Sequence, residues 1–287
     1  MFLFKRNNKE QPLRLITFST CYYILKSKFD DITYLSWIKN LISITTNFNL
    51  VIYTNDESYT YLSTLIKHST NNIKLIIKNF EDFYTYKYKD NWIKNHKQSN
   101  LDLHAHVDWK LNMLWNEKVF FVNQTIANKY FNTSYYGWCD IGYFRNRNND
   151  TPINFLQKWP NPEKLMSLPF NNNCIHYGCV QNDTLTYILL SNEIKKHYLT
   201  KSSSQPLIHN NANCFAGGFF ILKSNMIDNY AKLYNEKIVY YFTNNFIIKD
   251  DQTIIMDIIF CNQQLFYIHT EANPYMDNWF MFQRLLF

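Results

Sequence analysis

Short apolar runs alternate along the chain with longer segments whose apolar residues recur at helical spacing. The short runs predict strands at 13–20, 49–54, 73–77, 135–139, 216–222 and 265–269. The longer segments predict helices at 30–46, 58–67, 108–130, 183–198, 225–243 and 250–260. Strands that alternate with helices predict an α/β fold, in which helices flank a mostly parallel sheet.

Residues 80–108 interrupt this alternation, because they are aromatic, charged and irregular in pattern. We interpret them as an insertion or an active-site loop that acts as a lid. Residues 1–12 are expected to form a polar N-terminal extension. No linker composition divides the 287 residues, so the sequence predicts one domain, 1–287.

The composition is that of a folded chain with a substantial core. Hydrophobic residues make up 46% and aromatic residues 18%, whereas the chain contains only 5 Gly and 7 Pro. These values exclude disordered and collagen-like proteins. The net charge of +6 is mild and the basic residues are scattered, so a nucleic-acid partner is not expected.

The chain carries no sign of export or of membrane insertion. The first residues, Met1 to Arg6, become charged too early for a signal peptide, and no apolar stretch reaches about 18 residues. The 6 cysteines form no Cys-x-x-Cys pair and are expected to be reduced thiols. We therefore expect a cytoplasmic protein without a transmembrane segment, from a bacterium or from a virus inside its host cell.

Ligands of parallel α/β sheets bind at the carboxyl ends of the strands. Two predicted strands end at Thr20 and at Asn55, and a third ends at Asp140. An acid at the end of an apolar strand is costly unless it is paired or binds a cation, so Asp140 is a candidate ligand for a divalent ion. The alternative is a structural Asp that makes turn hydrogen bonds.

Three further groups of residues are candidates, each with a structural alternative. Asp250, Asp251 and Gln252 open a helix, as caps or as groups that face a sugar ring. Gly217 and Gly218 open a strand, as a bulge or to let a ligand approach the backbone. His269 ends the last strand, as a structural residue or as a second metal ligand with Asp140.

Two motifs carry weaker signals. Lys118 lies on the long helix before Asp140, either on a solvated face or within reach of a nucleotide phosphate or ribose. His104, His106 and Asp108 form a His-x-His-x-Asp pattern, which suggests a dinuclear metallohydrolase. The pattern lies in an irregular stretch and lacks a following His, so chance or a surface loop is the favoured reading.

Taken in order, these segments resemble the HtrL/YibB-type family (WlaTC-like proteins) of proposed glycosyltransferases of the GT-A type. The matching stretches are LITFSTCYYI, LVIYTND, LWNEKVFFVNQTI, YYGWCDIGYFR, AGGFF and DDQTII, and they run from about Leu13 to about Trp279. The layout is also similar to that of glycogenin and the bacterial galactosyltransferases. The resemblance implies a GT-A-like (Rossmann-like) mixed sheet.

The resemblance also implies roles for individual residues. Mn²⁺ or Mg²⁺ would bind Asp140 and His269, Gly217 and Gly218 would line the sugar pocket, and Asp251 and Gln252, with Asp250 beside them, would face the anomeric carbon. Thr20, Tyr22, Asn55 and Lys118 would contact the nucleotide. The chain departs from the Asp-x-Asp motif of those enzymes, because Gly142 stands in place of the second acid.

The function expected from this resemblance is a Leloir-type hexosyl- or pentosyltransferase. It would move a sugar from a nucleotide-diphosphate donor, UDP-sugar favoured, to a glycan, lipid-linked or protein-linked acceptor with help from a divalent metal. Two alternatives remain open at this point. One is a metallohydrolase centred on residues 104–108, and the other is a non-catalytic nucleotide- or glycan-binding module.

Overall fold

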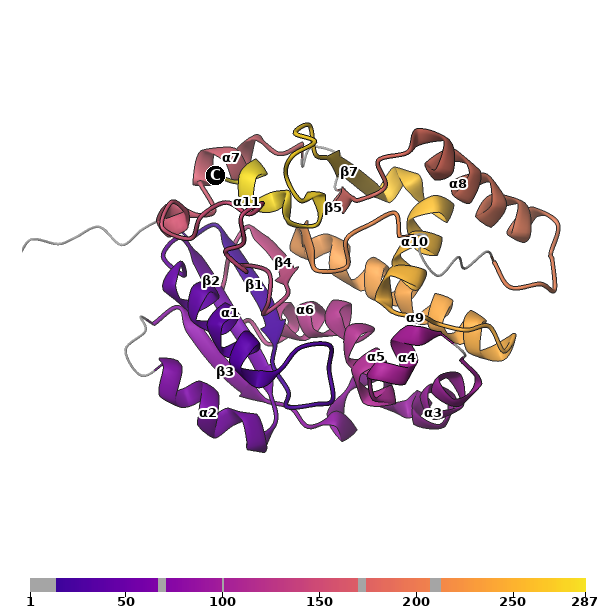
Figure 1. The fold of residues 1–287 in the computed structure, drawn as a ribbon, viewed down its shortest axis with the longest axis horizontal. Coiled ribbons are helices and arrows are strands. Elements are labelled where there is room, and N and C mark those ends of the chain that lie inside the picture. The colour runs from indigo at the N-terminus through magenta and orange to yellow at the C-terminus, as the bar shows by residue number, and fades with distance from the viewer. Residues whose placement is uncertain (1–13, 67–70, 100, 170–173, 207–212) are drawn as a thin grey trace, which may run out of the picture.

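The computed structural model describes residues 14–66, 71–99, 101–169, 174–206 and 213–287 (Figure 1). Within these ranges the strands form one seven-stranded sheet in the order β3-β2-β1-β4-β6-β5-β7. The strands are β1 (Ile16–Cys21), β2 (Phe48–Thr54), β3 (Ile73–Ile77), β4 (Tyr135–Cys139), β5 (Ile175–Cys179), β6 (Phe219–Leu222) and β7 (Phe266–Thr270).

The sheet is mixed and mostly parallel. β1 pairs in parallel with β2 and β4, β2 with β3, and β5 with β7. Among the strands described, only β6 runs against its neighbours, β4 and β5. The predicted fold class, a mostly parallel sheet flanked by helices, is confirmed.

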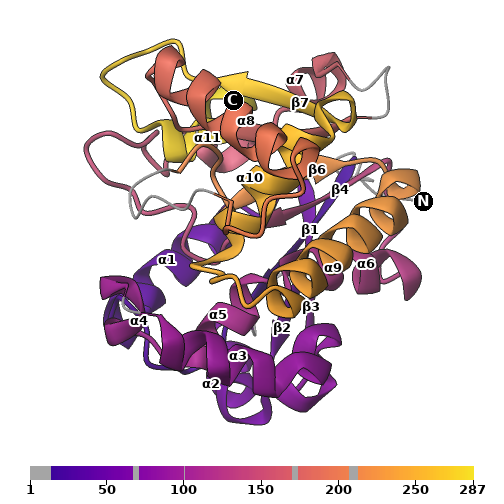
Figure 2. The ribbon, with the colours of Figure 1, turned by 90° about the vertical axis from the view of Figure 1, so that its right-hand side faces the viewer.

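Helices cover both faces of the sheet, as Figure 2 shows for α1 on one side and α6 with α9 on the other. The α-helices are α1 (Asp31–Ser43), α2 (Asp56–Ile66), α3 (Lys89–Gln98), α4 (Asp102–His106), α5 (Trp109–Trp115), α6 (Lys118–Ala127), α7 (Pro162–Ser167), α8 (Thr184–Leu199), α9 (Ile227–Thr243), α10 (Asp251–Cys261) and α11 (Phe282–Leu285). In the described part of the chain, none of them is both long and apolar enough to cross a bilayer.

The alternation of side chains along the strands separates two apolar cores. Val51, Tyr53 and Trp138 pack among buried residues of α6, α9 and α10. Phe18 and Leu50 belong to the opposite core, with residues of α1, α2, α7 and α11. Because successive residues of a strand point to opposite faces, both faces of the central strands are buried, which explains their continuous apolar runs.

The predicted long helix 108–130 is two helices, α5 and α6, separated at Asn116 and Glu117. The carboxylate of Glu117 is fully buried and accepts hydrogen bonds from the backbone N–H groups of Tyr84 and Thr85 at 2.6 and 3.0 Å. Lys78 Nζ lies 3.4 Å from the same carboxylate. Tertiary hydrogen bonds thus compete with the helical pattern at this position, and the sequence periodicity did not reveal them.

Residues 80–108 are not an irregular loop, as the sequence pattern suggested. They contain short 3-10 helices and the helices α3 and α4. Trp92 of α3 is buried, and its ring lies edge-on to that of Phe242 in α9. The segment is a packed helical insertion after β3, held in part by the Glu117 hydrogen bonds described above.

Gly137 in β4 provides a test of the central packing. A Cβ atom at this position would lie 2.2 Å from the carbonyl oxygen of Phe220 in β6. We expect Gly137→Ala to lower the free energy of unfolding by about 2–3 kcal/mol, because the backbone must separate to admit the methyl group. Urea unfolding measures this change.

Gly178→Ala in β5 is the matched control, because a Cβ there meets only the flexible side chain of Met281, at 3.2 Å. Its free energy of unfolding should change less than that of Gly137→Ala. Equal losses for the two variants would contradict the account of the β4–β6 contact.

Candidate active site

The end of β4 and the start of β6 come together at one edge of the sheet. Asp140 directly follows β4, and Gly217 and Gly218 directly precede β6. Because β6 runs antiparallel to β4, the residues before β6 lie beside the residues after β4. The backbone N–H of Asp140 donates to the carbonyl of Gly218 at 2.9 Å. The structure therefore places the candidate metal ligand Asp140 beside the candidate glycine pair, Gly217 and Gly218.

The ammonium group of Lys118 bridges this edge to the start of α10. Lys118 Nζ lies 3.0 Å from Asp140 Oδ1 and 2.8 Å from Asp251 Oδ2. It also donates to the carbonyl of Gly217 at 2.9 Å. Trp138 Nε1 donates to the same Asp140 oxygen at 2.6 Å. Lys118 is thus buried and paired with two carboxylates. The alternative left open by the sequence, that it lies on a solvated helix face, is wrong.

The carboxylates of Asp251 and Asp140 leave little room for a side chain at Gly217 and Gly218. A Cβ at Gly217 would lie 2.4 Å from Asp251 Oδ2, and one at Gly218 would lie 3.1 Å from Asp140 Oδ2. Any side chain at 217 would displace Asp251, which itself packs against Lys118. Glycine at this point is therefore required by the assembly of the charged cluster.

Asp250 and Gln252 flank Asp251 and present polar atoms that lack partners. Within the described residues, Asp250 Oδ1 and Gln252 Oε1 are buried without a hydrogen-bond partner. Asp250 is the N-cap residue of α10, but its side chain caps nothing. Buried polar atoms without partners are costly and need an explanation, so simple capping does not account for Asp250.

The buried charges change each other's ionisation. Burial opposes the charge on Lys118, but the carboxylates of Asp140 and Asp251 outweigh it and raise its pKa above the usual range. Burial, together with the neighbouring Asp250, raises the pKa of Asp251 to about 6 against the lowering effect of Lys118. A carboxyl group whose pKa approaches neutrality in a cleft is a candidate acid or base.

The charged cluster forms the floor of a cleft made of two neighbouring cavities of about 110 and 190 Å³. Both are lined by Lys118, Asp140 and Arg145. The second cavity is also lined by Gly217, Gly218, Asp250, Asp251 and Gln252. The structure thus gathers the candidates from β4, β6, α6 and α10 in one place.

Aromatic side chains form the wall of the first cavity. Tyr22, Tyr34, Trp37 and Trp115 line it, together with the carboxylate of Asp31. The hydroxyl of Tyr22 donates to Asp31 Oδ1 at 3.4 Å. Of the residues assigned to the nucleotide from the resemblance, Tyr22 and Lys118 reach this cleft.

The other sequence candidates lie elsewhere. Thr20 is fully buried within β1, and Asn55 Oδ1 accepts the N–H of Ser58 at the start of α2. His269 Nε2 lies 2.9 Å from His176 Nδ1, and burial lowers the pKa of His269 to about 4. None of the three lines either cavity. The structure does not bring His269 to Asp140.

The His-x-His-x-Asp pattern is not a metal site. His104 is buried, with Nε2 2.8 Å from the carbonyl of Lys249, whereas His106 is exposed. Asp108 caps α5 by accepting the N–H of Lys110 at 2.7 Å. No group of three His, Cys, Asp or Glu able to hold a metal occurs among the residues that the structure describes. The metallohydrolase alternative loses its geometric basis.

Sequence reasoning missed several residues of the cleft. Lys28, Phe29, Arg145, Trp279 and Phe280 line the second cavity. Arg145 closes the most specific of the matching stretches, YYGWCDIGYFR, so its place after Asp140 was a usable signal. The aromatic residues of the cleft could not be singled out in the sequence. The chain holds 23 Phe and 7 Trp, and most residues of these types are expected to lie in the core.

The chain was compared with families of known sequence. Residues 26–286 match the model of a family described as bacterial protein of unknown function (HtrL_YibB). No curated protein matches the chain in sequence. The match covers most of the chain, including every residue of the cleft except those of β1 and the turn that follows it.

Several solved structures are similar to the chain at low sequence identity. Mouse xyloside xylosyltransferase 1 in its apo form shares 13% identity and a TM-score of 0.44, with 88% of this chain and 85% of that chain covered. Galactosyltransferase LgtC in complex with donor and acceptor sugar analogs shares 10% identity at a TM-score of 0.45, with 92% of this chain and 83% of that chain covered. The 4-diphosphocytidyl-2C-methyl-D-erythritol synthase from Anaerococcus prevotii shares 8% identity at a TM-score of 0.42, with 92% of this chain and 91% of that chain covered.

Lys118→Met tests whether the ammonium controls the ionisation of Asp251. At pH 8 the variant leaves the buried carboxylate of Asp251 without its cation, so we expect a loss of about 3 kcal/mol in the free energy of unfolding. At pH 5, below the pKa of about 6 of Asp251, that carboxyl is largely protonated and the loss should be smaller. Urea unfolding at both pH values measures the difference.

The pH dependence has a defined sign. A carboxyl whose pKa is raised by folding favours the folded state at low pH, and this contribution is lost as the pH rises through the folded pKa. Removing Lys118 raises that pKa further, so the variant loses stability over a wider range of pH than the wild type. The exposed Lys232→Met is the control. An equal loss at pH 5 and pH 8 would contradict the coupling.

Proposed function

The chain belongs to the HtrL_YibB family, and from this premise and the geometry of the cleft we propose that it is a glycosyltransferase. It would move a sugar from a nucleotide-diphosphate donor to a hydroxyl group of an acceptor. The observation that carries the proposal is the cluster in which the buried Lys118 joins the partly exposed Asp140 to the buried Asp251 beneath an aromatic-walled cavity. A metallohydrolase or a purely apolar binding site does not require this cluster.

The chemistry of glycosyl transfer fits such a floor. The bond between the anomeric carbon and the donor phosphate breaks, and a bond to the acceptor oxygen forms. The nucleoside diphosphate leaves with the bonding electron pair, and the acceptor hydroxyl loses its proton. Positive charge develops on the sugar ring, where a carboxylate such as that of Asp251 stabilises it. Asp250, whose Oδ1 lacks a partner among the described residues, is available to accept the proton or to bind a sugar hydroxyl.

The two cavities suit different parts of the donor. We assign the nucleoside to the first, where aromatic rings of Tyr22, Tyr34 and Trp37 can pack on a base and where Asp31 can accept hydrogen bonds from ribose hydroxyls. We assign the sugar to the second, above Asp251 and Gln252. Trp279 and Phe280 border the second cavity, and their rings suit the apolar face of an acceptor sugar.

The divalent metal expected from the resemblance does not fit the residues present. Asp140 Oδ1 is already engaged by Lys118 and Trp138, and Gly142 offers no side chain. His269 Nε2 lies 2.9 Å from His176 Nδ1, and His269 lines neither cavity. No group of three His, Cys, Asp or Glu able to hold a metal occurs in the described part of the chain, and the neighbouring carboxylate of Asp251 is paired with Lys118. No step of the proposed reaction therefore passes through a metal.

The finer parts of the proposal follow from the same reading. We propose that the whole chain forms one catalytic domain, that UDP is the first donor nucleotide to test, and that the acceptor is a glycan or a lipid- or protein-linked saccharide. Lys118 acts by holding the two carboxylates in place and by setting the ionisation of Asp251. It is a positioning residue in this scheme.

Substitution of the carboxylates tests the function directly. With a panel of UDP-, GDP- and dTDP-hexoses and pentoses, and mixed glycan acceptors, we expect release of nucleotide and a glycosylated product. Asp251→Asn should lower the rate about 10²-fold or more, because the variant removes the charge that stabilises the transition state. Mass spectrometry of products and coupled nucleotide assays measure this loss.

The exposed Asp90→Asn serves as a charge-matched control and should keep the wild-type rate. Thermal unfolding of Asp251→Asn should remain cooperative, which separates loss of chemistry from loss of fold. Binding of nucleotides without turnover of any donor would instead favour a non-catalytic module. Full activity of Asp251→Asn would remove this residue from the reaction.

The pH dependence of the rate provides an independent test. Asp251 must be ionised to stabilise positive charge, and its pKa is raised to about 6. The rate of transfer should therefore rise with pH through about 6 and level off above it. A pH–rate profile between pH 4.5 and 8.5 measures the midpoint, and a rate that stays constant across this range would exclude Asp251 as the ionising group.

A further inference from the structure

Arg145 occupies the wall that the two cavities share. Its Nε donates to the carbonyl of Gly142 at 3.0 Å. The centre of its guanidinium lies 4.4 Å from the ring centroid of Trp37, 5.3 Å from that of Phe29 and 5.1 Å from that of Phe280. One backbone carbonyl and three aromatic rings thus fix the group at the cleft.

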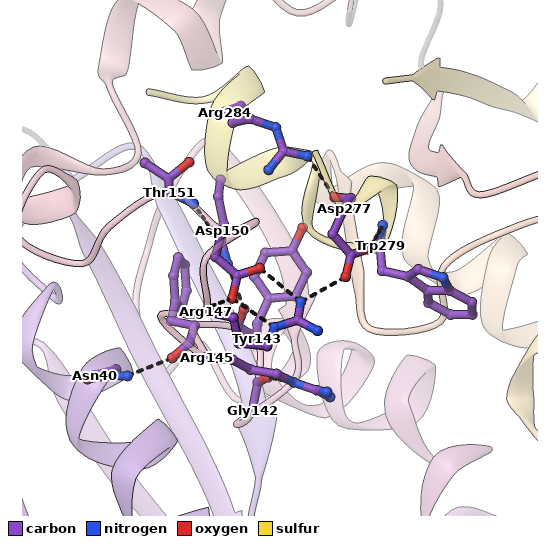
Figure 3. A network of polar contacts seen from close by, with 12 residues as sticks. Asn40, Gly142, Tyr143, Arg145, Arg147, Asp150, Thr151, Asp277, Trp279 and Arg284 are labelled. Carbon is purple, nitrogen blue, oxygen red and sulfur yellow. Dashed lines mark hydrogen bonds and ion pairs between the residues drawn. The ribbon is translucent and has the colours of Figure 1, made fainter. Parts of the chain in front are cut away.

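The neighbouring arginines are paired with carboxylates, and Arg145 is not. Arg147 Nη2 lies 2.9 Å from Asp150 and 2.8 Å from Asp277, and Arg284 pairs with Glu271. Figure 3 shows the Arg147, Asp150 and Asp277 network, with Arg145 on the side away from Arg284. Among the described residues no carboxylate lies within ion-pair distance of Arg145. Its outer N–H groups therefore have no anion of the protein to bind.

Burial and the proximity of Arg147 lower the pKa of Arg145, although the more distant carboxylates of Asp140 and Asp150 act against this. A guanidinium nevertheless keeps its proton in proteins, so Arg145 remains a cation. A half-buried cation that none of the described carboxylates pairs with is unfavourable, and an anionic ligand would relieve that cost.

Gly142 links this arrangement to the motif that departs from Asp-x-Asp. A Cβ at position 142 would lie 2.6 Å from Cε3 of Trp37, the ring that also lies closest to Arg145. An acid at this position would have to displace Trp37. The position of Trp37 therefore both holds Arg145 in its cage of three aromatic rings and leaves no room for an acidic side chain at position 142.

We propose that Arg145 binds the diphosphate of the donor, in place of a metal bridge to the missing second acid. The proposal rests on the proposed function for the identity of the donor. Guanidinium groups present paired N–H donors that match phosphate oxygens, and a caged guanidinium loses little freedom on binding. Lys28 lines the second cavity as well and adds a second positive charge near the same ligand.

Calorimetric titration with inorganic pyrophosphate, UDP and uridine tests the proposal in buffer that contains EDTA. We expect wild-type protein to bind pyrophosphate and UDP under chelation. Arg145→Met should weaken both at least 10-fold and leave uridine binding unchanged, because uridine has no phosphate. Arg145→Lys should lose less, since it keeps the charge but not the planar pair of donors.

Lys232→Met is the control for loss of one positive charge, since Lys232 is 73% exposed in its side chain. Wild-type affinity of Arg145→Met for pyrophosphate and UDP would overturn the proposal. Binding of pyrophosphate by wild-type protein only after addition of Mn²⁺ would also overturn it. If Arg145→Met fails to fold, the ratio of pyrophosphate to uridine affinity in Arg145→Lys decides.

These titrations separate the inference from the proposed function. Pyrophosphate binding needs neither a sugar nor an acceptor, so it is measured whether or not transfer occurs. Binding that depends on Arg145 in a chain that transfers no sugar would refute the glycosyltransferase and keep the anion site. Sugar transfer by the wild-type protein, together with unchanged pyrophosphate and UDP binding in Arg145→Met, would keep the glycosyltransferase and refute the anion site.

Discussion

The buried ammonium of Lys118 is the constraint on which the site depends. A lysine removed from water must meet carboxylates and hydrogen-bond acceptors, or the charge is too costly to bury. Its partners come from the end of β4, the turn before β6 and the first turn of α10. Segments distant in the sequence are thereby fixed at one edge of the sheet, and the antiparallel direction of β6 makes the arrangement possible.

The break between α5 and α6 follows from the same constraint. Glu117 and Lys118 are adjacent and both buried, but they serve different clusters. Glu117 holds the backbone of Tyr84 and Thr85 in the helical insertion, whereas Lys118 holds Asp140 and Asp251. The start of α6 therefore ties the insertion to the floor of the cleft. Within the described residues, the insertion contributes no side chain to either cavity. It is linked to the site through this pair and through hydrogen bonds from Asn95 and His104 to the backbone of Ile248 and Lys249, just before Asp250.

Much of the fold could be predicted from the sequence, because the strands are buried on both faces and appear as continuous apolar runs. Asp140 and the acids of 250–251 stood out for the same reason, as charges bordering apolar segments. His269 and Thr20 also ended apolar runs, yet they lie outside the cleft. His269 belongs to β7 at the edge of the sheet, and Thr20 is buried within β1 although the next residue, Cys21, lines the first cavity. The role of Lys118 was hidden because a lysine at helical spacing looks solvated until its partners are known.

Counting charges at the cleft distinguishes the two cations that line both cavities. Lys118 faces two carboxylates, and a third, that of Asp250, lies beside them with Lys249 Nζ 3.7 Å away. Three carboxylates thus meet two ammonium groups, so the floor is negative overall. A negative floor suits a sugar that gains positive charge, but it repels a diphosphate. The positive charge that attracts the diphosphate must therefore come from a group that no carboxylate has neutralised. Arg145 satisfies this condition at the junction of the cavities, where a phosphate that links a nucleoside in one to a sugar in the other would lie.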